Sequence, residues 1–303
     1  MDQGQIDDGV RRSRLLVSRR RALSLGGTIG LGALLAACGR DSASDGAASP
    51  SAAPPLTPTT TAPDDVIAAL DAARTCTTSP EQTQGPYWFD VDSIRSDIRE
   101  DRPGALLQLA LRVQDVSSCS SGGRATPVTS CVVEVWHCDA GGLYSGFESG
   151  SIGSGGAPPG APSRRGARTQ GGGGASSGQV SDGSYAAGDQ EAPTTDDGTY
   201  LRGAQVADGN GIVQFTTIFP GWYRGRTPHI HLKVHLNRES VLTSQVYMED
   251  EVANEVYAAA PYSSRTGRRT RNSDDSIFSD DGVLTVRRQQ NGYLGLINLG
   301  VDV

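Results

Sequence analysis

Six short apolar runs, each bounded by turn residues, most constrain what this chain can fold into. They are 106–113, 131–136, 212–219, 229–236, 245–248 and 282–286, and Gly, Pro, Asn or Asp residues separate them. Many short runs of this kind predict an all-β sandwich with long loops. We expect one clear helix, around Asp64–Arg74.

Residues 1–37 have the features of an export signal. Arg20 and Arg21 give a twin-arginine pattern, and the apolar stretch that follows is shorter than the roughly 20 residues a membrane-spanning helix needs. Residues 35–38 resemble a bacterial lipobox, so we expect cleavage to leave a lipidated Cys38. An ordinary secretory signal with an incidental cysteine is the alternative. The lipoprotein reading predicts twin-arginine export and anchoring at the outer side of the cytoplasmic membrane, at the cell surface or in the periplasm.

Two further segments can bury little apolar surface. Residues 38–63 are rich in Ser, Ala, Pro and Thr, which predicts a disordered tether. Residues 149–199 are rich in Gly and Ser, and we expect an insertion without regular structure, either a surface loop or a mobile lid. The remaining chain, 64–303, is then one sandwich domain that carries this insertion.

The charge of the chain bears on its partners. The formal net charge is −7, and it becomes −10 after cleavage because residues 1–37 hold six arginines and three aspartates. An acidic protein argues against nucleic acid as a partner. Nothing in the sequence indicates the oligomeric state.

Two of the four histidines, His229 and His231, form a His-x-His pair in a predicted strand. Residues two apart in a strand face the same side, about 6–7 Å apart, so both imidazoles can reach one metal ion. Tyr223 lies six residues before His229, and Tyr144 follows the run 131–136, so both are candidate oxygen donors. We expect the other two histidines, at 137 and 235, to have structural roles.

Four pieces of the sequence, in this order, resemble the intradiol ring-cleavage dioxygenases, the family of protocatechuate and catechol dioxygenases. They are Gly85-Pro86-Tyr87, the strand from Val133 through Trp136 to Tyr144, Pro220-Gly221-Trp222-Tyr223, and Arg226 followed by His229-Ile230-His231. The resemblance covers about residues 76–250. It implies a sandwich of the transthyretin-like kind.

The resemblance also implies a non-haem Fe(III) site. Its expected ligands are Tyr144, Tyr223, His229 and His231. A bound cation can lower the pKa of tyrosine from about 10 far enough to give a phenolate. Tyr223 is also expected to yield to the substrate and take its proton, and Arg226 and Gln245 are expected catalytic residues beside the metal. The implied reaction uses O2 to open a catechol-type ring between its hydroxylated carbons, which gives a muconate-type diacid.

Other functions remain open at this point. Tyr223 and His229 are closer in sequence than in the cytoplasmic members, which is typical of an exported branch and leaves open which catechol, hydroxyquinol or protocatechuate is the substrate. One alternative is a non-catalytic, ligand-binding lipoprotein on the same fold. Another is a ferrous dioxygenase with two histidines and one carboxylate, but no Asp or Glu flanks residues 229–231.

Four cysteines remain if Cys38 is lipidated, and an even number outside the cytoplasm suggests two disulfides. The absence of a Cys-x-x-Cys spacing argues against zinc. In one strand Cys131 and Cys138 would lie roughly 23 Å apart, beyond the ~7 Å limit for a bridge. Two connectivities then remain. A hairpin of 106–116 with 131–137 favours Cys119–Cys131 with Cys76–Cys138.

Overall fold

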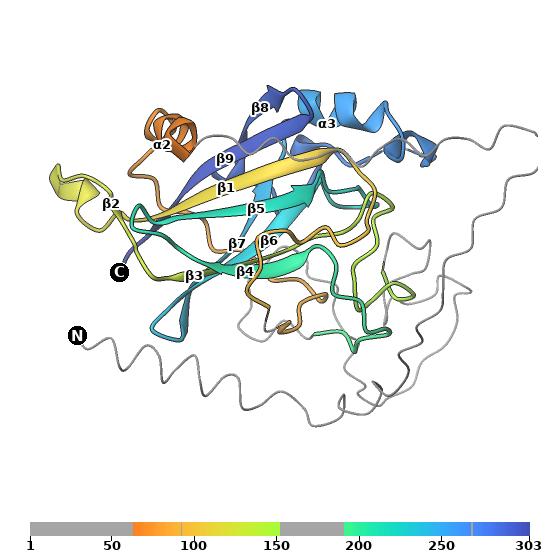
Figure 1. Ribbon diagram of the computed structural model, residues 1–303, viewed down its shortest axis with the longest axis horizontal. Helices are drawn as coiled ribbons and strands as arrows, with labels where there is room; N and C mark the ends of the chain where they lie inside the picture. Colours follow the sequence, from red (N-terminus) through yellow and green to blue (C-terminus); the bar gives the residue numbers. More distant parts are fainter. Residues whose placement is uncertain (1–62, 92, 152–190, 268) are drawn as a thin grey trace, which may run out of the picture. The chain divides into compact units, whose positions relative to one another are not determined.

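A computed structural model describes residues 63–91, 93–151, 191–267 and 269–303 (Figure 1). The predictions for the export signal, for Cys38, for nearly all of the tether and for most of the 149–199 insertion lie outside these residues. Within the described ranges, no helix is long and apolar enough to cross a membrane.

The first sheet is built around β1 (Leu106–Asp115). It pairs antiparallel with β5 (Ile212–Ile218) along one edge and parallel with β9 (Gly292–Val301) along the other. The short β2 (Thr126–Pro127) pairs with the end of β1, and β8 (Thr285–Gln289) pairs with β9. Helix α2 (Pro63–Asp71) packs three apolar side chains on residues of β1, β5 and β9; these three are Val66, Ala69 and Leu70.

The second sheet has the order β4-β3-β6-β7 and is antiparallel throughout. Its strands are β4 (Arg202–Val206), β3 (Val132–Trp136), β6 (His229–Leu236) and β7 (Glu239–Tyr247). Helix α3 (Asp250–Tyr257) follows β7. Within the described ranges, four 3₁₀ turns lie in the connections, at Cys119–Ser121, Tyr262–Ser264, Asn272–Asp274 and Asp280–Gly282.

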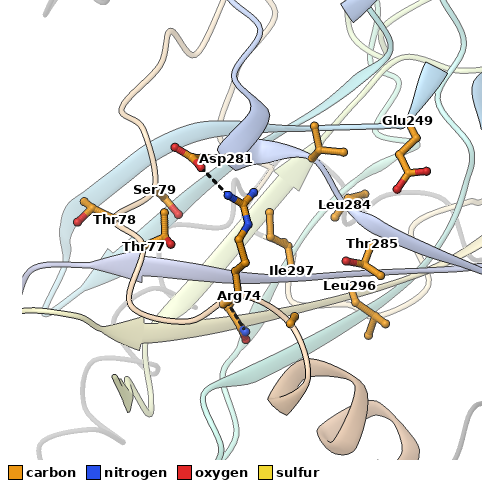
Figure 2. Close-up of a pocket in the computed structure, with 13 residues that line it drawn as sticks. Arg74, Thr77, Thr78, Ser79, Glu249, Asp281, Leu284, Thr285, Leu296 and Ile297 are labelled. Carbon is orange, nitrogen blue, oxygen red and sulfur yellow. Dashed lines mark hydrogen bonds and ion pairs between the residues drawn. The ribbon is translucent and has the colours of Figure 1, made fainter. Parts of the chain in front are cut away.

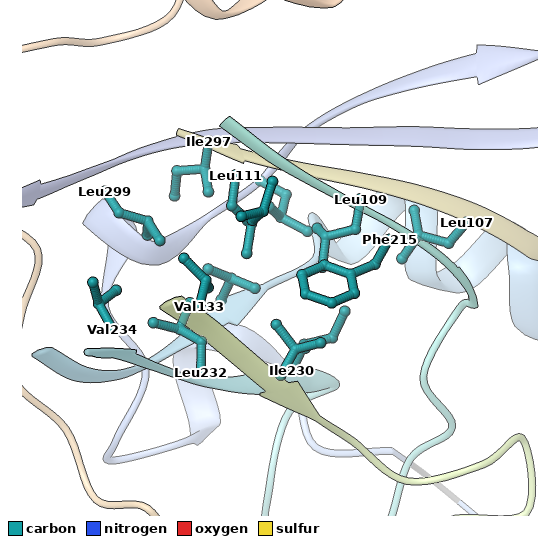
Figure 3. Close-up of a cluster of buried hydrophobic side chains, with 14 of the residues drawn as sticks. Leu107, Leu109, Leu111, Val133, Phe215, Ile230, Leu232, Val234, Ile297 and Leu299 are labelled. Carbon is teal, nitrogen blue, oxygen red and sulfur yellow. The ribbon is translucent and has the colours of Figure 1, made fainter. Parts of the chain in front are cut away.

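The core fills the space between the two sheets (Figure 3). Leu107, Leu109 and Leu111 project into it from β1, and Ile230 and Leu232 project from β6. Each such side chain contributes about 1.5–3 kcal/mol when it leaves water. Because successive side chains of a strand alternate between its faces, His229 and His231 lie on the opposite, outer face of β6. The predicted all-β sandwich is therefore confirmed, and the histidine pair sits outside its apolar core.

Most of the predicted elements are present, with shifts at their ends. The helix expected around Asp64–Arg74 is α2, which ends at Asp71. The strand predicted at 282–286 is β8, which begins only at Thr285 because residues 280–282 form a 3₁₀ turn. Strands β2, β4 and β9 and helix α3 were not predicted.

The predicted hairpin is wrong, because β1 and β3 belong to different sheets. The disulfides inferred from it, Cys119–Cys131 and Cys76–Cys138, are wrong as well. Cys76 is bonded to Cys119, with 5.5 Å between their Cα atoms. Cys131 and Cys138 are buried free thiols that do not pair, and each packs in an apolar cluster. A buried thiol can serve as a small hydrophobe, so an even number of cysteines did not require two bridges.

Candidate metal centre

Four side-chain donors meet on the outer face of the second sheet. The Nε2 atoms of His229 and His231 lie 3.1 Å apart. The Tyr223 hydroxyl lies 3.1 Å from His229 Nε2, and the Tyr144 hydroxyl lies 3.3 Å from the same nitrogen and 3.4 Å from the Tyr223 hydroxyl. All four residues are buried. The structure thus brings together the four side chains that the sequence indicated as ligands.

This arrangement fits a metal ion better than a hydrogen-bond network. The neutral nitrogen His229 Nε2 has one lone pair and can accept one hydrogen bond, yet three polar atoms surround it. Nitrogen and oxygen atoms that share one metal at about 2.0–2.2 Å lie roughly 3.0–3.5 Å apart, depending on the angle between them. The four observed separations fall in that range. A cation between the atoms would use a lone pair from each of them.

The two imidazoles are held in the form that binds a metal. His229 Nδ1 lies 2.6 Å from the Thr227 carbonyl oxygen and donates its proton there, which leaves the Nε2 lone pair free. His231 stacks on Trp136, with ring centroids 5.0 Å apart, and its Nδ1 is buried without a hydrogen-bond partner in the described part of the chain. Burial, helped by the charge of Arg226, lowers the pKa of both histidines well below its usual range. Both are therefore neutral at pH 7.

The two tyrosines need a cation before they can ionise. Burial raises the pKa of Tyr144 well above its usual range, and the neighbouring Tyr223 raises it further. Burial raises the pKa of Tyr223 as well, against a smaller opposing effect from Arg226. A metal ion at the centre of the four donors would reverse this balance, because its charge would stabilise the phenolates.

Tyr144 is carried by residues 137–151, which we call the Tyr144 loop. One oxygen of Asp139 accepts the backbone N–H groups of Gly141 and Leu143, both at 2.9 Å, and so closes the turn before Tyr144. The Tyr144 N–H donates to the Ser151 hydroxyl at 2.9 Å. The Asp196 carboxylate accepts two further N–H groups of the loop, each at 2.8 Å. The described ends of the 149–199 insertion are therefore bonded to the Tyr144 loop.

Arg202 of β4 supports this loop, and sequence reasoning did not single it out. Its guanidinium donates to the hydroxyl and carbonyl oxygens of Ser145 and to the Tyr87 carbonyl oxygen, all at 2.8 Å. The central carbon of the Arg202 guanidinium lies 4.4 Å from the centre of the Phe89 ring. Burial lowers the pKa of Arg202 to about 10. A fully buried arginine in an otherwise unremarkable strand carries no local sequence signal.

Tyr223 is carried by residues 221–226, which we call the Tyr223 turn. Tyr223 and Arg226 pair across a turn formed by Arg224 and Gly225, and Gly225 has a φ of 95°. The short return through Gly225 that the sequence allowed is therefore present. Gly221 lies against the Asp139 carbonyl oxygen so closely that a side chain would not fit. The Tyr223 turn and the Tyr144 loop are in direct contact.

Arg226 and Gln245 are also next to the four donors. Gln245 lies opposite His231 in the ladder between β6 and β7. The Arg226 guanidinium donates to its amide oxygen at 2.5 Å and to the Asp275 carboxylate at 2.9 Å. The Gln245 amide N–H group donates to the Thr83 carbonyl oxygen at 2.9 Å. Asp275 and Thr83 lie in loops far from residue 226 in sequence, and no spacing rule indicated them.

Among the residues that the structure describes, no carboxylate completes the histidine pair. The described ranges contain no group of three or more His, Cys, Asp or Glu side chains that could hold a metal ion. This finding disfavours the ferrous alternative with two histidines and one carboxylate for this part of the chain.

The remaining histidines have the structural roles that we expected. His137 is buried and lies 2.7 Å from the Thr217 hydroxyl and 2.8 Å from the Cys138 carbonyl oxygen. His235 is partly exposed, and its Nε2 lies 3.6 Å from a Glu134 carboxylate oxygen.

Comparison with solved structures finds dioxygenases. The chain is similar to an intradiol ring-cleavage dioxygenase from Tetranychus urticae, at 28% identity and a TM-score of 0.59, over 75% of this chain and 95% of that one. A second dioxygenase structure matches at 28% identity and a TM-score of 0.58, with the same coverage. The dioxygenase domain of a carbohydrate-binding fusion protein from Streptomyces sp. SirexAA-E matches at 23% identity and 0.46, over 75% and 99% of the two chains. No protein-family model matches the chain, and no curated protein matches its sequence.

Proposed function

Because the chain belongs to the intradiol ring-cleavage dioxygenases, we propose that it uses non-haem Fe(III) and O2 to open a catechol-type ring between the two hydroxylated carbons. The product is a muconate-type diacid that carries both atoms of O2. The observation that carries the proposal is the convergence of two tyrosine hydroxyls and two neutral imidazoles: both hydroxyls and His231 Nε2 lie 3.1–3.3 Å from His229 Nε2, and the two hydroxyls lie 3.4 Å apart.

Tyr144, Tyr223, His229 and His231 would hold the ion. When bound, Fe(III) supplies a strong positive charge that stabilises the phenolates and both oxygens of a catechol dianion, which makes the ring reactive towards O2. Two anionic oxygens with two neutral nitrogens favour the ferric over the ferrous state. This charge balance supports Fe(III) as the metal.

The chain's own residues have distinct tasks in this proposal. Tyr223 is 6% exposed whereas Tyr144 is fully enclosed, and Tyr223 sits on a two-residue turn, so of the two tyrosines it is the one that an incoming diol would reach and replace. When ionised, its phenolate oxygen would take a proton from the incoming diol. Arg226, fixed by Asp275 and Gln245, keeps a permanent positive charge beside the reacting ring and stabilises negative charge that develops there.

We also propose that the enzyme is exported by the twin-arginine route and anchored through a lipid on Cys38. The disulfide between Cys76 and Cys119 supports a location outside the reducing cytoplasm. Replacing Arg20 and Arg21 by lysine should block export. Replacing Cys38 by serine should move the protein from the membrane fraction to the soluble one; a cleaved variant that stays in the membrane fraction would refute the anchor.

The catalytic proposal is tested by colour and oxygen uptake. The full chain purified with iron should hold about one ferric ion and absorb visible light through tyrosinate-to-iron charge transfer. Addition of catechol, hydroxyquinol or protocatechuate should shift this band, and at least one of them should consume O2 and give a diacid. A protein that stays colourless after reconstitution with iron would refute the ferric centre. A coloured protein that consumes no O2 with any diol would instead favour the ligand-binding alternative.

A further inference from the structure

A pocket that we call the Arg265 pocket lies beside the Tyr223 turn. It has a volume of about 300 Å³, and it is formed by Trp222, by the second half of α3 and by the segment after the Tyr262–Ser264 turn. The side chains that matter here are Trp222, Asn254, Tyr257, Arg265 and Arg269. Its volume is at the lower end of the range for small-molecule sites.

Arg265 is the unusual member of this pocket. Its guanidinium lies 4.7 Å from the centre of the Trp222 ring, and within the described ranges it has no carboxylate partner and no hydrogen-bond acceptor. Its Nε is buried without a partner. Arginine side chains in such surroundings are normally paired, because a guanidinium carries five donors. An acceptor for Arg265 is therefore missing from the described part of the protein.

The other charges of the pocket nearly cancel. Arg269 donates to the Asp250 carboxylate at 2.6 Å and to the Asn254 amide oxygen at 2.9 Å. The carbonyl end of α3 adds a partial negative charge of about half a unit, which is smaller than the full charge of Arg265. The pocket thus keeps a net positive charge.

Another pocket, around Arg74, contains an arginine whose guanidinium is paired with protein acceptors (Figure 2). It has a volume of about 240 Å³, and its arginine, Arg74, is bonded to the Asp281 carboxylate at 2.9 Å and to the Asp280 carbonyl oxygen at 3.1 Å. Arg74 therefore offers less to an anion than Arg265 does. It is a natural control for any test of anion binding.

The wall of the Arg265 pocket is bonded to the segment that delivers Tyr223. The Tyr257 hydroxyl donates to the Pro220 carbonyl oxygen at 2.8 Å, and the Tyr262 hydroxyl donates to the Phe219 carbonyl oxygen at 2.6 Å. Trp222 immediately precedes Tyr223. The pocket therefore has aromatic walls that are hydrogen-bonded to the backbone just before the Tyr223 turn.

We propose that this pocket binds a small organic carboxylate, with the carboxylate on the Arg265 guanidinium and the carbon skeleton against Trp222 and Tyr257. Arginine and carboxylate match in geometry because two parallel N–H groups meet two oxygens. Two sources share this chemistry: an aromatic carboxylic acid, or a ring-opened diacid such as the product of the proposed reaction. The site does not depend on catalysis, so direct binding tests it even if the proposed function fails.

The test is isothermal titration of the full, iron-loaded chain with benzoate, with cis,cis-muconate and with the neutral analogue benzamide. At least one of the two acids should bind saturably at millimolar concentrations or below, and benzamide should not. Binding of benzoate alone assigns the site to aromatic acids, and binding of muconate alone assigns it to ring-opened diacids. Binding of neither acid, or equal binding of benzamide, would overturn the proposal.

Variants locate the site. Arg265→Gln should weaken acid binding at least tenfold, because a charge-assisted hydrogen bond is lost. Asn254→Asp keeps an acceptor for Arg269 but adds a negative charge, so it should weaken binding similarly without altering the fold. Arg74→Gln should leave the affinity unchanged. Unchanged affinity in Arg265→Gln would place the acid elsewhere, for example on the metal, and refute the proposal; if that variant does not fold, Asn254→Asp decides in the same way.

Discussion

Tyr144 and Tyr223 reach the same point in the molecule by different means. The Tyr144 loop is held by its own Ser151 and by side chains from distant segments, among them Asp196 and Arg202. The Tyr223 turn is short, and its path depends on the positive φ of Gly225. One candidate ligand is therefore fixed through a long loop with many contacts, whereas the other is carried by one short turn. This contrast suits a metal centre that keeps its ion while the substrate replaces one donor.

The largest expected effect separates the two tyrosines directly. Tyr144→Phe should lose most of the iron, because a fixed donor disappears and the phenyl ring stays in its place. Tyr223→Phe should keep more of the iron, with an altered colour and slower turnover. Iron content by atomic absorption, together with the visible spectrum, measures both. Equal loss of iron in the two variants would remove the distinction between a fixed and a displaceable ligand.

Arg202, which supports the Tyr144 loop, and Arg224 of the Tyr223 turn should differ strongly in their effect on the free energy of unfolding. Arg202→Met leaves buried acceptors at Ser145 and Tyr87 without donors, which costs about 3 kcal/mol in the free energy of unfolding. Arg224→Gln, on the exposed corner of the Tyr223 turn, should change it by no more than about 0.5 kcal/mol. Urea denaturation of both variants measures the difference. A similar cost for both would show that Arg202 does not support the Tyr144 loop.

His137, at the start of the Tyr144 loop, makes the stability of that side depend on pH. Burial lowers its pKa to about 4, whereas the unfolded chain takes up the proton near pH 6.5. Stability is therefore lost as the pH falls from 6.5 to 4, by about 3 kcal/mol for this group. In His137→Gln this contribution is absent, so wild type should lose about that much more than the variant. If the stability of wild type and variant fell in parallel with pH, His137 would not be a buried neutral histidine. The other histidines are present in both proteins, so their contributions to the difference cancel.

The smallest effects come from one glycine in each segment. Gly142 and Gly225 both have a positive φ, but a Cβ at Gly142 would lie 2.6 Å from the Trp222 carbonyl oxygen, whereas one at Gly225 would meet nothing within 4 Å. We expect Gly142→Ala to cost about 2 kcal/mol, from strain and overlap, and Gly225→Ala to cost about 1 kcal/mol, from strain alone. Thermal unfolding of the two variants distinguishes these values. The reverse order would mean that the Tyr223 turn is the more constrained segment.

The sequence predicted the parts of this molecule that follow from local periodicity. The alternation in β6 placed His229 and His231 on one face, and the short return to Tyr223 required a flexible residue where Gly225 stands. Whether the four donors bind iron remains a proposal, but their proximity was expected from spacing and resemblance. Cys131 and Cys138 were also expected not to pair with each other, and they do not.

The structural features that the sequence did not predict depend mostly on contacts between distant segments. β9 contains Gly295 and Gly300, which weaken its strand pattern, and its pairing with β1 is parallel and cannot be read from a turn. Helix α3 spans eight residues, too short for a clear period. The roles of Asp275 and Arg202 depend on contacts with segments far away in sequence, so no local pattern indicates them. The disulfide error has the same origin, because it assumed that consecutive strands pair.

The parallel pairing of β1 with β9 has a consequence for how the protein is made. Arg112 of β1 bonds to Asn298 of β9 across 186 residues of sequence. At a synthesis rate of about 5–20 residues per second, β1 emerges from the ribosome roughly 10–40 seconds before its partner exists. During that interval the leucines of β1 lack at least one of the two neighbouring strands. We therefore expect the nascent chain to expose apolar surface that a chaperone can bind until β9 has been made.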